Sequence, residues 1–172
     1  MPSPTASPSS NPLNANVSAL DRADAEVLSA LFEQILRALP YYNDRARAAE
    51  LAKYSAAGLQ KLVEHDPGSV LVAKVGSDLV GYCISSHDDS LVWMAWIAVR
   101  PDFRRMKIAS NLIQELEHRA QSLGSHKIWC DCRTENELSK LTLGRNGFQP
   151  ICTIPNHWFE QDFILWEKFV TP

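Results

Sequence analysis

The sequence predicts an α/β (α+β) protein built on one mixed, mostly antiparallel sheet of about seven strands with about four helices on its faces. Three observations support this fold class. The chain has 172 residues, 45% hydrophobic and 22% charged, which is typical of a globular domain with one core. Runs rich in β-branched residues are separated by segments of helical periodicity. Their order is strand, two helices, three strands, helix, strand, helix and two strands, which requires helices packed on a sheet.

The N-terminal elements are a tail, a strand and a helix. Residues 1–14 hold four of the ten prolines, serines between them and no charged side chain, so we expect a disordered tail before one domain over residues 15–172. The run VSAL near Asn16 predicts a short strand. Asp21 can cap a helix that Pro40 ends, and its apolar positions at helical spacing are Val27, Leu28, Leu31, Ile35 and Leu39.

The next segments predict more helix and then a meander. Residues 44–64 have helical character, but Gly58 lies inside them and Ser55 can cap a second piece, so both one kinked helix and two short helices are open. Residues 69–75, 78–86 and 91–99 are β-rich and are separated by turn-like residues. We expect three antiparallel strands here.

The C-terminal part predicts two helices and three strands. A stripe of apolar residues from Ile108 to Leu123 indicates a long helix that Gly124 ends, and residues 127–132 form the next strand. Thr134 and Glu137 have the spacing of a capping box and open a short helix toward residues 146–147. Residues 148–154 and 159–169 predict a closing pair of strands.

A cluster of basic residues marks the start of the long helix. Arg104, Arg105 and Lys107 are expected in its first turn, where cations oppose the helix dipole. An anionic ligand held by free backbone N–H groups and guanidinium groups resolves this conflict, and a pyrophosphate fits it. A solvated basic turn is the alternative. Residues 82–123 contain no glycine, which excludes a P-loop and a GxGxxG dinucleotide loop in this segment.

Composition restricts the other classes of function. The net charge of -3 gives no general attraction to nucleic acid or anionic lipid, and no apolar run approaches the length that spans a bilayer. We therefore expect a cytoplasmic protein without a nucleic-acid or membrane partner. A monomer and a homodimer are both open. The four cysteines form no CxxC pair, so we expect no metal site and interpret them as buried structural thiols: Cys83, Cys130, Cys132 and Cys152.

Two motif regions resemble the GCN5-related N-acetyltransferase (GNAT) superfamily, and the resemblance covers residues 16–169. The segment IAVRPDFRRMKIASNLI is similar to the acetyl-CoA segment of the family, an Arg or Gln followed by x-x-Gly-x-Gly/Ala, which Arg104 and Ala109 match at its ends. Lys107 stands where the family usually has glycine. The segment CDCRTENELSKLTLGRNGF matches the second region through Asn136, while Leu143 occupies the place of a Tyr that protonates the leaving thiolate in many members.

The resemblance implies a donor site as well as a fold. It implies a sheet splayed between the fourth and fifth strands, with acetyl-CoA or another short acyl-CoA in the opening as co-substrate. The pantetheine arm would pair with the fourth strand, and the pyrophosphate would rest on the amides that follow it. The implied cofactor-binding residues are Ile97, Ala98, Val99, Arg104, Arg105, Met106, Lys107, Ile108, Ala109, Asn136 and Leu143.

Acetyl transfer to an amine also needs a proton acceptor, because an amine of pKa ~10.4 is almost fully protonated at pH 7. In similar enzymes that acetylate ribosomal protein N-termini a fifth-strand Glu has this role, and Asp131 takes its place here. The alternative is an Asp131 that simply pairs with Arg133 or Lys127 on its strand. Another subgroup of the family has its base on the fourth strand, but the corresponding stretch here, residues 93–96, has no ionisable group. We therefore expect no base on this strand, and we expect Trp93 and Trp96 in the core or a cleft wall.

Residues around the acceptor pocket are also implied. His157 is the second candidate base, with a surface histidine as the alternative. Aromatic and acidic side chains beside it favour a cationic amine, and the implied substrate-binding residues are Tyr41, Tyr42, Trp158 and Glu160.

The expected function is thus an acetyl-CoA-dependent N-acetyltransferase. It would transfer an acetyl group to a primary amine of a small molecule or peptide by direct transfer in a ternary complex. The departures at Lys107 and Leu143 leave one alternative, a catalytically impaired acyl-CoA-binding regulatory module on the same fold.

Overall fold

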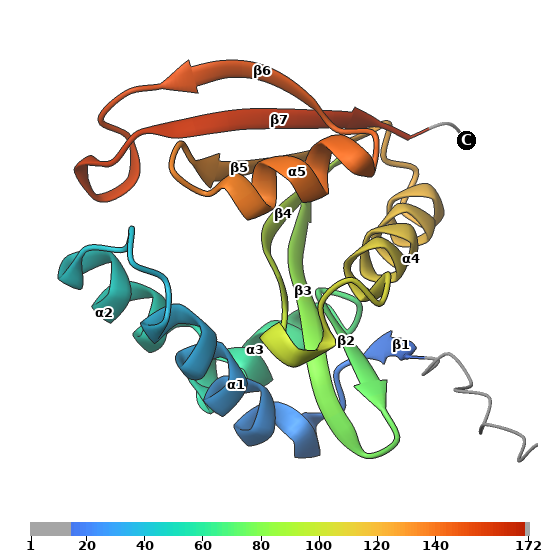
Figure 1. The fold of residues 1–172 in the computed structure, drawn as a ribbon. Coiled ribbons are helices and arrows are strands. Elements are labelled where there is room, and N and C mark those ends of the chain that lie inside the picture. The colour runs from blue at the N-terminus through green and yellow to red at the C-terminus, as the bar shows by residue number, and fades with distance from the viewer. Residues whose placement is uncertain (1–14, 171–172) are drawn as a thin grey trace, which may run out of the picture.

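The computed structural model describes residues 15–170, and the predicted tail over residues 1–14 lies outside them. This part of the chain forms seven strands and five α-helices (Figure 1). The strands are β1 (Asn16–Ala19), β2 (Val70–Val75), β3 (Asp78–Asp88), β4 (Leu91–Val99), β5 (Lys127–Arg133), β6 (Gln149–Ile154) and β7 (Phe163–Phe169). The helices are α1 (Ala25–Arg37), α2 (Asp44–Lys53), α3 (Ala56–His65), α4 (Ile108–Ser122) and α5 (Glu137–Arg145).

All seven strands belong to one sheet, in the order β1-β2-β3-β4-β5-β7-β6. The pair β4–β5 is parallel, and the other neighbouring pairs are antiparallel. The long connection through α4 is what allows β5 to run parallel to β4. The predicted mixed, mostly antiparallel sheet is confirmed.

The sheet splits between its two central strands. β4 pairs with β5 only from Leu91 to Met94, opposite Lys127 to Cys130. Beyond this point β4 continues to Val99 along β3, whereas β5 continues to Arg133 along β7. Figure 1 shows the two halves of the sheet diverging, with α1 and α2 beside the open end. The last residues of β4 therefore have no strand partner on the β5 side.

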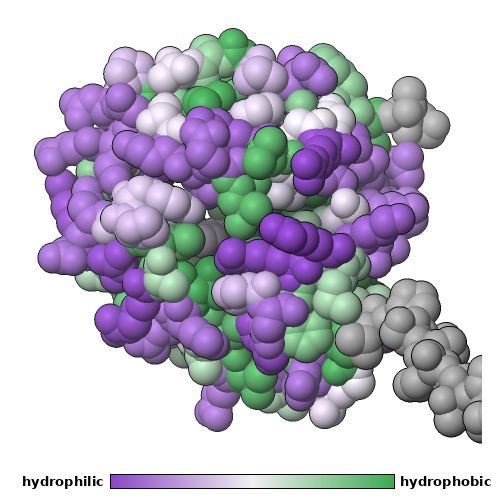
Figure 2. All heavy atoms as spheres, in the orientation of Figure 1, coloured by the Kyte–Doolittle hydropathy of each residue, from purple (hydrophilic) through white to green (hydrophobic). Residues whose placement is uncertain are grey.

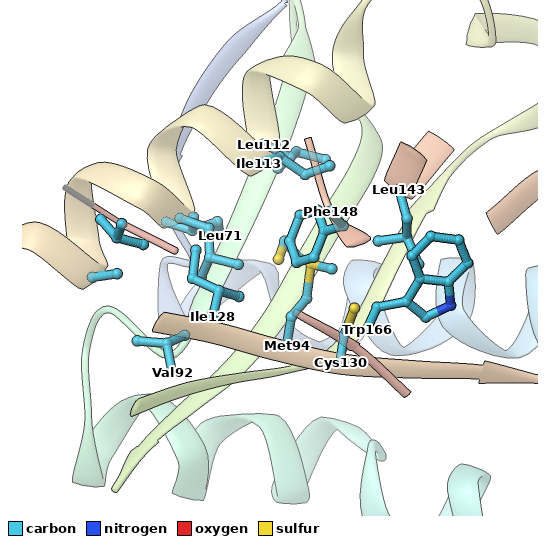
Figure 3. Packing of buried hydrophobic residues seen from close by; sticks show 14 of the residues in the cluster. Leu71, Val92, Met94, Leu112, Ile113, Ile128, Cys130, Leu143, Phe148 and Trp166 are labelled. Carbon is cyan, nitrogen blue, oxygen red and sulfur yellow. The ribbon is translucent and has the colours of Figure 1, made fainter. Parts of the chain in front are cut away.

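Helices cover the sheet on both faces, and each face has its own hydrophobic core. α4 and α5 pack on one face, where apolar residues of α4 meet β5, β7 and α5 (Figure 3). α1 and α3 pack on the other face, against β2 and β3. No helix within residues 15–170 is long and apolar enough to cross a membrane.

The helical region before the meander consists of two helices. The Ser55 hydroxyl accepts a hydrogen bond of 3.3 Å from Gly58 N and caps α3, so of the two open predictions the second is correct. Asp21 caps a short 3-10 turn (Arg22–Asp24) that leads into α1. Of the apolar positions at helical spacing, Leu28, Leu31 and Ile35 are buried, whereas 54% of the surface of Val27 is exposed.

Two local predictions need correction at the starts of α4 and α5. Helix α4 begins at Ile108, so the basic residues precede it and do not form its first turn. The reason is backbone conformation, because Arg105 and Lys107 have φ of 65° and 61° in the left-handed region. The capping box of α5 is also absent. Asn136 caps this helix by accepting a bond of 3.1 Å from Ser139 N, while the Thr134 hydroxyl donates to Glu135.

Candidate functional site

A cavity of about 900 Å³ opens where β4 and β5 separate. Its walls are the end of β4, the segment that leads into α4, the end of β5 and parts of α5. The loop between α1 and α2 and the loop between β6 and β7 border it from outside the sheet. In the same orientation as Figure 1, hydrophobic surface is visible in the middle of the molecule between hydrophilic borders (Figure 2).

The cavity brings together most residues that the family resemblance assigned to the cofactor. Met106 is the exception, because its side chain packs against the hydrophobic core beside α4. The assigned residues that line the cavity are Ile97, Ala98, Val99, Arg104, Arg105, Lys107, Ile108, Ala109, Asn136 and Leu143. Arg145 on α5 also lines it, and no sequence motif pointed to this arginine.

One end of the cavity is rich in free donors and positive charge. The first main-chain hydrogen bond at the start of α4 runs from Asn111 N to Lys107 O over 3.0 Å, so the preceding backbone N–H groups have no helical acceptor. Arg100 is held by Asp102 at 2.6 Å. Within residues 15–170, Arg104, Arg105 and Lys107 form no ion pair with an acidic side chain. This combination of amides and uncompensated cations suits an anion.

Asp131 lies at the other end, on the part of β5 that has left β4. Its Oδ2 accepts a hydrogen bond of 2.9 Å from Trp158 Nε1. Burial raises the pKa of Asp131, and the hydrogen bond from Trp158 partly offsets this rise. A carboxylate with a raised pKa accepts protons more readily than an ordinary aspartate.

The alternative interpretation of Asp131 as a simple ion-pair partner does not match the contacts. Lys127 donates to Glu167 at 2.6 Å. Arg133 donates through Nε to Gln161 at 2.8 Å, and its guanidinium lies 3.4 Å from the ring centre of Tyr42. Both candidate partners of Asp131 are therefore bonded elsewhere.

The residues expected around the acceptor are only partly assembled. Tyr41, Tyr42 and Trp158 line the cavity. His157 does not, and its ring packs 4.4 Å from the Trp158 ring. Glu160 also lies outside the lining, 4.0 Å from Arg45 and exposed to solvent. Glu160 therefore does not supply the acidic side chain that we expected beside the acceptor.

Sequence reasoning missed Glu50, a partly buried residue of α2. Its Oε2 accepts a hydrogen bond of 3.0 Å from Trp96 Nε1 on β4, and both residues line the cavity with Trp93. Little in the sequence indicates a role for Glu50, because α2 carries no motif and Ala46 is its one buried residue. Glu50 reaches the site only through the tertiary packing of α2 against the open end of the sheet.

Two thiols also line the cavity, Cys130 and Cys132. Burial raises the pKa of Cys132 to about 11 and that of Cys130 as well. Both therefore remain protonated near neutral pH and are poor nucleophiles. Cys83 is also buried as predicted, but the prediction was wrong for Cys152, which is exposed because β6 is the edge strand of the sheet.

Comparison with known proteins agrees with this geometry. The family model described as the acetyltransferase (GNAT) family matches residues 29–148. The chain belongs to the GNAT acetyltransferase family. The match extends from α1 through the basic segment and Asp131 to the end of α5, so it includes most of the cavity walls.

Individual curated relatives, all named as acetyltransferases, are similar over shorter stretches. An acetyltransferase of Pectobacterium atrosepticum is 33% identical over 79 residues, which is 46% of this chain and 56% of that protein. An acetyltransferase of Sodalis glossinidius is 32% identical over 79 residues, with the same shares. The chain thus spans little more than half the length of these curated relatives.

Several solved structures share the fold over nearly the whole chain. Ard1 of Thermoplasma volcanium has a TM-score of 0.74 at 18% identity and covers 92% of this chain and 99% of its own. The PaiA N-acetyltransferase of Thermoplasma acidophilum, solved with coenzyme A, has a TM-score of 0.75 at 17% identity, over 91% and 99%. YncA of Salmonella typhimurium, solved with acetyl-CoA, has a TM-score of 0.70 at 20% identity, over 92% and 95%.

Proposed function

We propose that this protein is an acetyl-CoA-dependent N-acetyltransferase that acetylates a primary amine of a small molecule or peptide by direct transfer in a ternary complex. The observation that carries the proposal is the split between β4 and β5 beyond Met94 and Cys130. It creates one cavity with an anion-binding end at residues 104–109 and a carboxylate, Asp131, at the other. Donor and acceptor can therefore meet inside the sheet.

The donor end fits an acyl-CoA. The side of β4 that faces the cavity at residues 97–99 offers backbone groups to the amides of a pantetheine arm, as a further strand would, once the long 3.4 Å hydrogen bond from Arg104 Nε to Val99 O gives way. The N–H groups at the start of α4, with Arg104 and Arg105, suit a pyrophosphate. Two solved relatives, PaiA with coenzyme A and YncA with acetyl-CoA, support this choice of ligand. Bound there, acetyl-CoA supplies the acetyl group as a thioester.

Asp131 is the base in this proposal. The acceptor arrives as an ammonium ion and must lose a proton before its nitrogen can attack the thioester carbon. The Asp131 carboxylate takes this proton, directly or through one water, and its raised pKa favours the transfer. His157 has no contact with the substrate in this proposal, because it lies outside the cavity lining and its ring packs 4.4 Å from the Trp158 ring.

The thiolate that leaves must be protonated by another group. Leu143 has no proton to donate and is 3% exposed in the core, so in this proposal water relays to the thiolate the second proton, which the nitrogen loses as the amide forms. The first proton stays on Asp131 until it is released to solvent. A covalent acyl-enzyme on Cys130 or Cys132 is disfavoured, because both thiols are protonated near neutral pH. One-step transfer to the amine remains, with positioning as a main contribution.

A thermal-shift experiment tests the donor site. Acetyl-CoA should raise the melting temperature, because a ligand of the folded state stabilises it by RT ln(1 + [L]/Kd). Charge reversal of Arg104 and Arg105 together should remove most of that shift. Arg37 and Lys61, both exposed and outside the cavity, provide the control double reversal, which should keep it. An equal shift in the two double variants would contradict the proposed donor site.

Release of coenzyme A thiol in the presence of primary amines then separates the enzyme from the binding module. Amine-dependent release supports N-acetyl transfer. Stabilisation by acetyl-CoA without release against a panel of small amines and peptides would favour the regulatory module instead, which the departures at Lys107 and Leu143 also suggest.

A further inference from the structure

Two carboxylates border the acceptor end of the cavity, although the proposed chemistry uses one. Asp131 comes from β5 and Glu50 from α2, on separate walls. Each is oriented by an indole N–H, since Trp158 donates to Asp131 at 2.9 Å and Trp96 donates to Glu50 at 3.0 Å. The charge of Glu50 also contributes to the raised pKa of Asp131, so the two carboxylates interact electrostatically. Both carboxylates thus face the cavity in which the acceptor would bind, and Lys53 and Arg133 also line it.

The charge of Glu50 is not neutralised by its own helix. Arg45 lies 4.0 Å from Glu160 and Arg47 lies 3.4 Å from Asp44, so both arginines of α2 face other acids. The ammonium group of Lys53 lies 5.1 Å from the ring centre of Tyr54. Within residues 15–170 no cationic side chain comes within ion-pair distance of Glu50. A partly buried carboxylate without a counterion favours an external cation.

The carboxylate of Glu50 is also held in one position before an acceptor binds. Trp96 stacks on Tyr42, with ring centres 5.7 Å apart and planes inclined by 26°. Phe32 contacts the same indole edge-on at 4.8 Å. The guanidinium of Arg133 covers Tyr42 at 3.4 Å. These contacts hold the indole, and its N–H in turn holds one oxygen of Glu50, so the carboxylate does not need to be ordered by the substrate.

We propose that Glu50 is a specificity-determining residue that binds a second, non-reacting positive charge of the acceptor, so that the preferred acceptor is a diamine. The inference rests on the proposed function. The reacting nitrogen gives up its proton at Asp131 and is neutral when it attacks, so it cannot remain an ion-pair partner for a second carboxylate. A second cationic group of the acceptor, which takes no part in the reaction, keeps its charge and can pair with Glu50. A monoamine leaves Glu50 without a partner.

Steady-state kinetics with acetyl-CoA and two amines of equal chain length, pentylamine and its diamine counterpart cadaverine, test this inference. We expect kcat/KM of the intact protein to favour the diamine by about tenfold or more, as for a charge-assisted contact in a partly buried site. Glu50→Gln should bring the ratio close to one by raising KM for the diamine, with little change in kcat. The amide oxygen can still accept from Trp96, so the fold is retained.

Asp44→Asn is the matched control, because it removes the same charge from an exposed position of the same helix outside the cavity. It should keep the diamine preference. The pH profile gives a second readout that a purely structural role would not move. Loss of the Glu50 charge lowers the pKa of Asp131, which Trp158, His157, Arg133 and burial continue to set, so the acid limb of kcat/KM should shift to lower pH in Glu50→Gln.

The outcomes separate this inference from the proposed function. Acetylation of both amines with equal kcat/KM, or a diamine preference that survives in Glu50→Gln, overturns the role of Glu50 and leaves N-acetyl transfer in place. Acetylation of other amines but of neither probe also overturns it. Absence of acetylation with every amine overturns the proposed function, and the inference with it.

Discussion

Trp158 Nε1 lies 2.9 Å from Asp131 Oδ2, and this hydrogen bond joins the loop between β6 and β7 to the free end of β5. Trp158 is 52% exposed, so its ring is not held by a core, and the bond to Asp131 is a main contact of its polar end. The bond stabilises the charged form of the carboxylate, whereas burial destabilises it. Burial and this hydrogen bond are the two largest effects on the pKa of Asp131, and the hydrogen bond can be removed by one substitution.

Asp131→Asn should lower kcat/KM for a primary amine by ~10² or more near neutral pH, because the variant has no general base. The loss should shrink as the pH approaches ~10, where the free amine is already neutral. It should also shrink at acidic pH, where the native carboxylate is itself protonated. Rates measured from pH 5 to 10 check this, and a pH-independent loss would contradict the role of Asp131 as base.

Trp158→Phe should move the acid limb of the pH profile toward higher pH. The hydrogen bond lowers the pKa of Asp131, so its removal raises that pKa further and the base is lost earlier as the pH falls. The plateau rate at higher pH should change little. Trp129→Phe is a suitable control, because its indole nitrogen is buried without a partner within the described part of the chain and the residue lies outside the cavity. Identical profiles for the two variants would show that the bond does not tune Asp131.

Lys107→Gly should keep the stabilisation by acetyl-CoA and raise the free energy of unfolding by up to about 1 kcal/mol. Lys107 has φ of 61°, a conformation that glycine adopts without strain, although glycine also gains freedom in the unfolded state. Urea unfolding measures this change. Lys107→Ala retains the strain and removes the ammonium group. If both variants lose the response to acetyl-CoA, the ammonium group itself contacts the ligand.

Leu143→Phe and Leu143→Tyr should both destabilise the fold by about 1–3 kcal/mol, because the side chain is 3% exposed and packs near Phe148 and Trp166 (Figure 3). The two variants differ by one hydroxyl group. We expect them to have equal kcat, since water serves as the acid in the proposed mechanism. A higher kcat for the Tyr variant would show that proton delivery to the thiolate is limiting in the native protein.

The sheet and its helices could be predicted because hydrophobic periodicity is strong in these segments. Residues 69–75, 78–86 and 91–99 match β2, β3 and β4 closely, and the stripe from Ile108 places α4. The residues proposed for the donor site came from the resemblance to the GNAT motifs, and all of them except Met106 line the cavity. The local sequence was sufficient to predict those parts of the site that a single short segment forms.

Other features depend on contacts that no local pattern encodes. The start of α4 was misplaced because Lys107, a residue that does not favour positive φ, adopts the conformation that glycine usually supplies. Glu50 was missed because its partner Trp96 lies 46 residues away in the sequence. Glu160 and Phe159 have φ of 62° and 55°, so the backbone turns sharply between β6 and β7, and Glu160 lies outside the cavity.

The most direct test of the account measures both products of one reaction. The protein is incubated with acetyl-CoA and a primary amine, and free thiol and acetylated amine are quantified together for the native chain and for Asp131→Asn. We predict equal amounts of the two products, no acetyl group retained on the protein, and a rate that falls ~10² or more in the variant. Thiol release without acetylated amine, or equal rates for the two proteins, would contradict direct transfer assisted by Asp131.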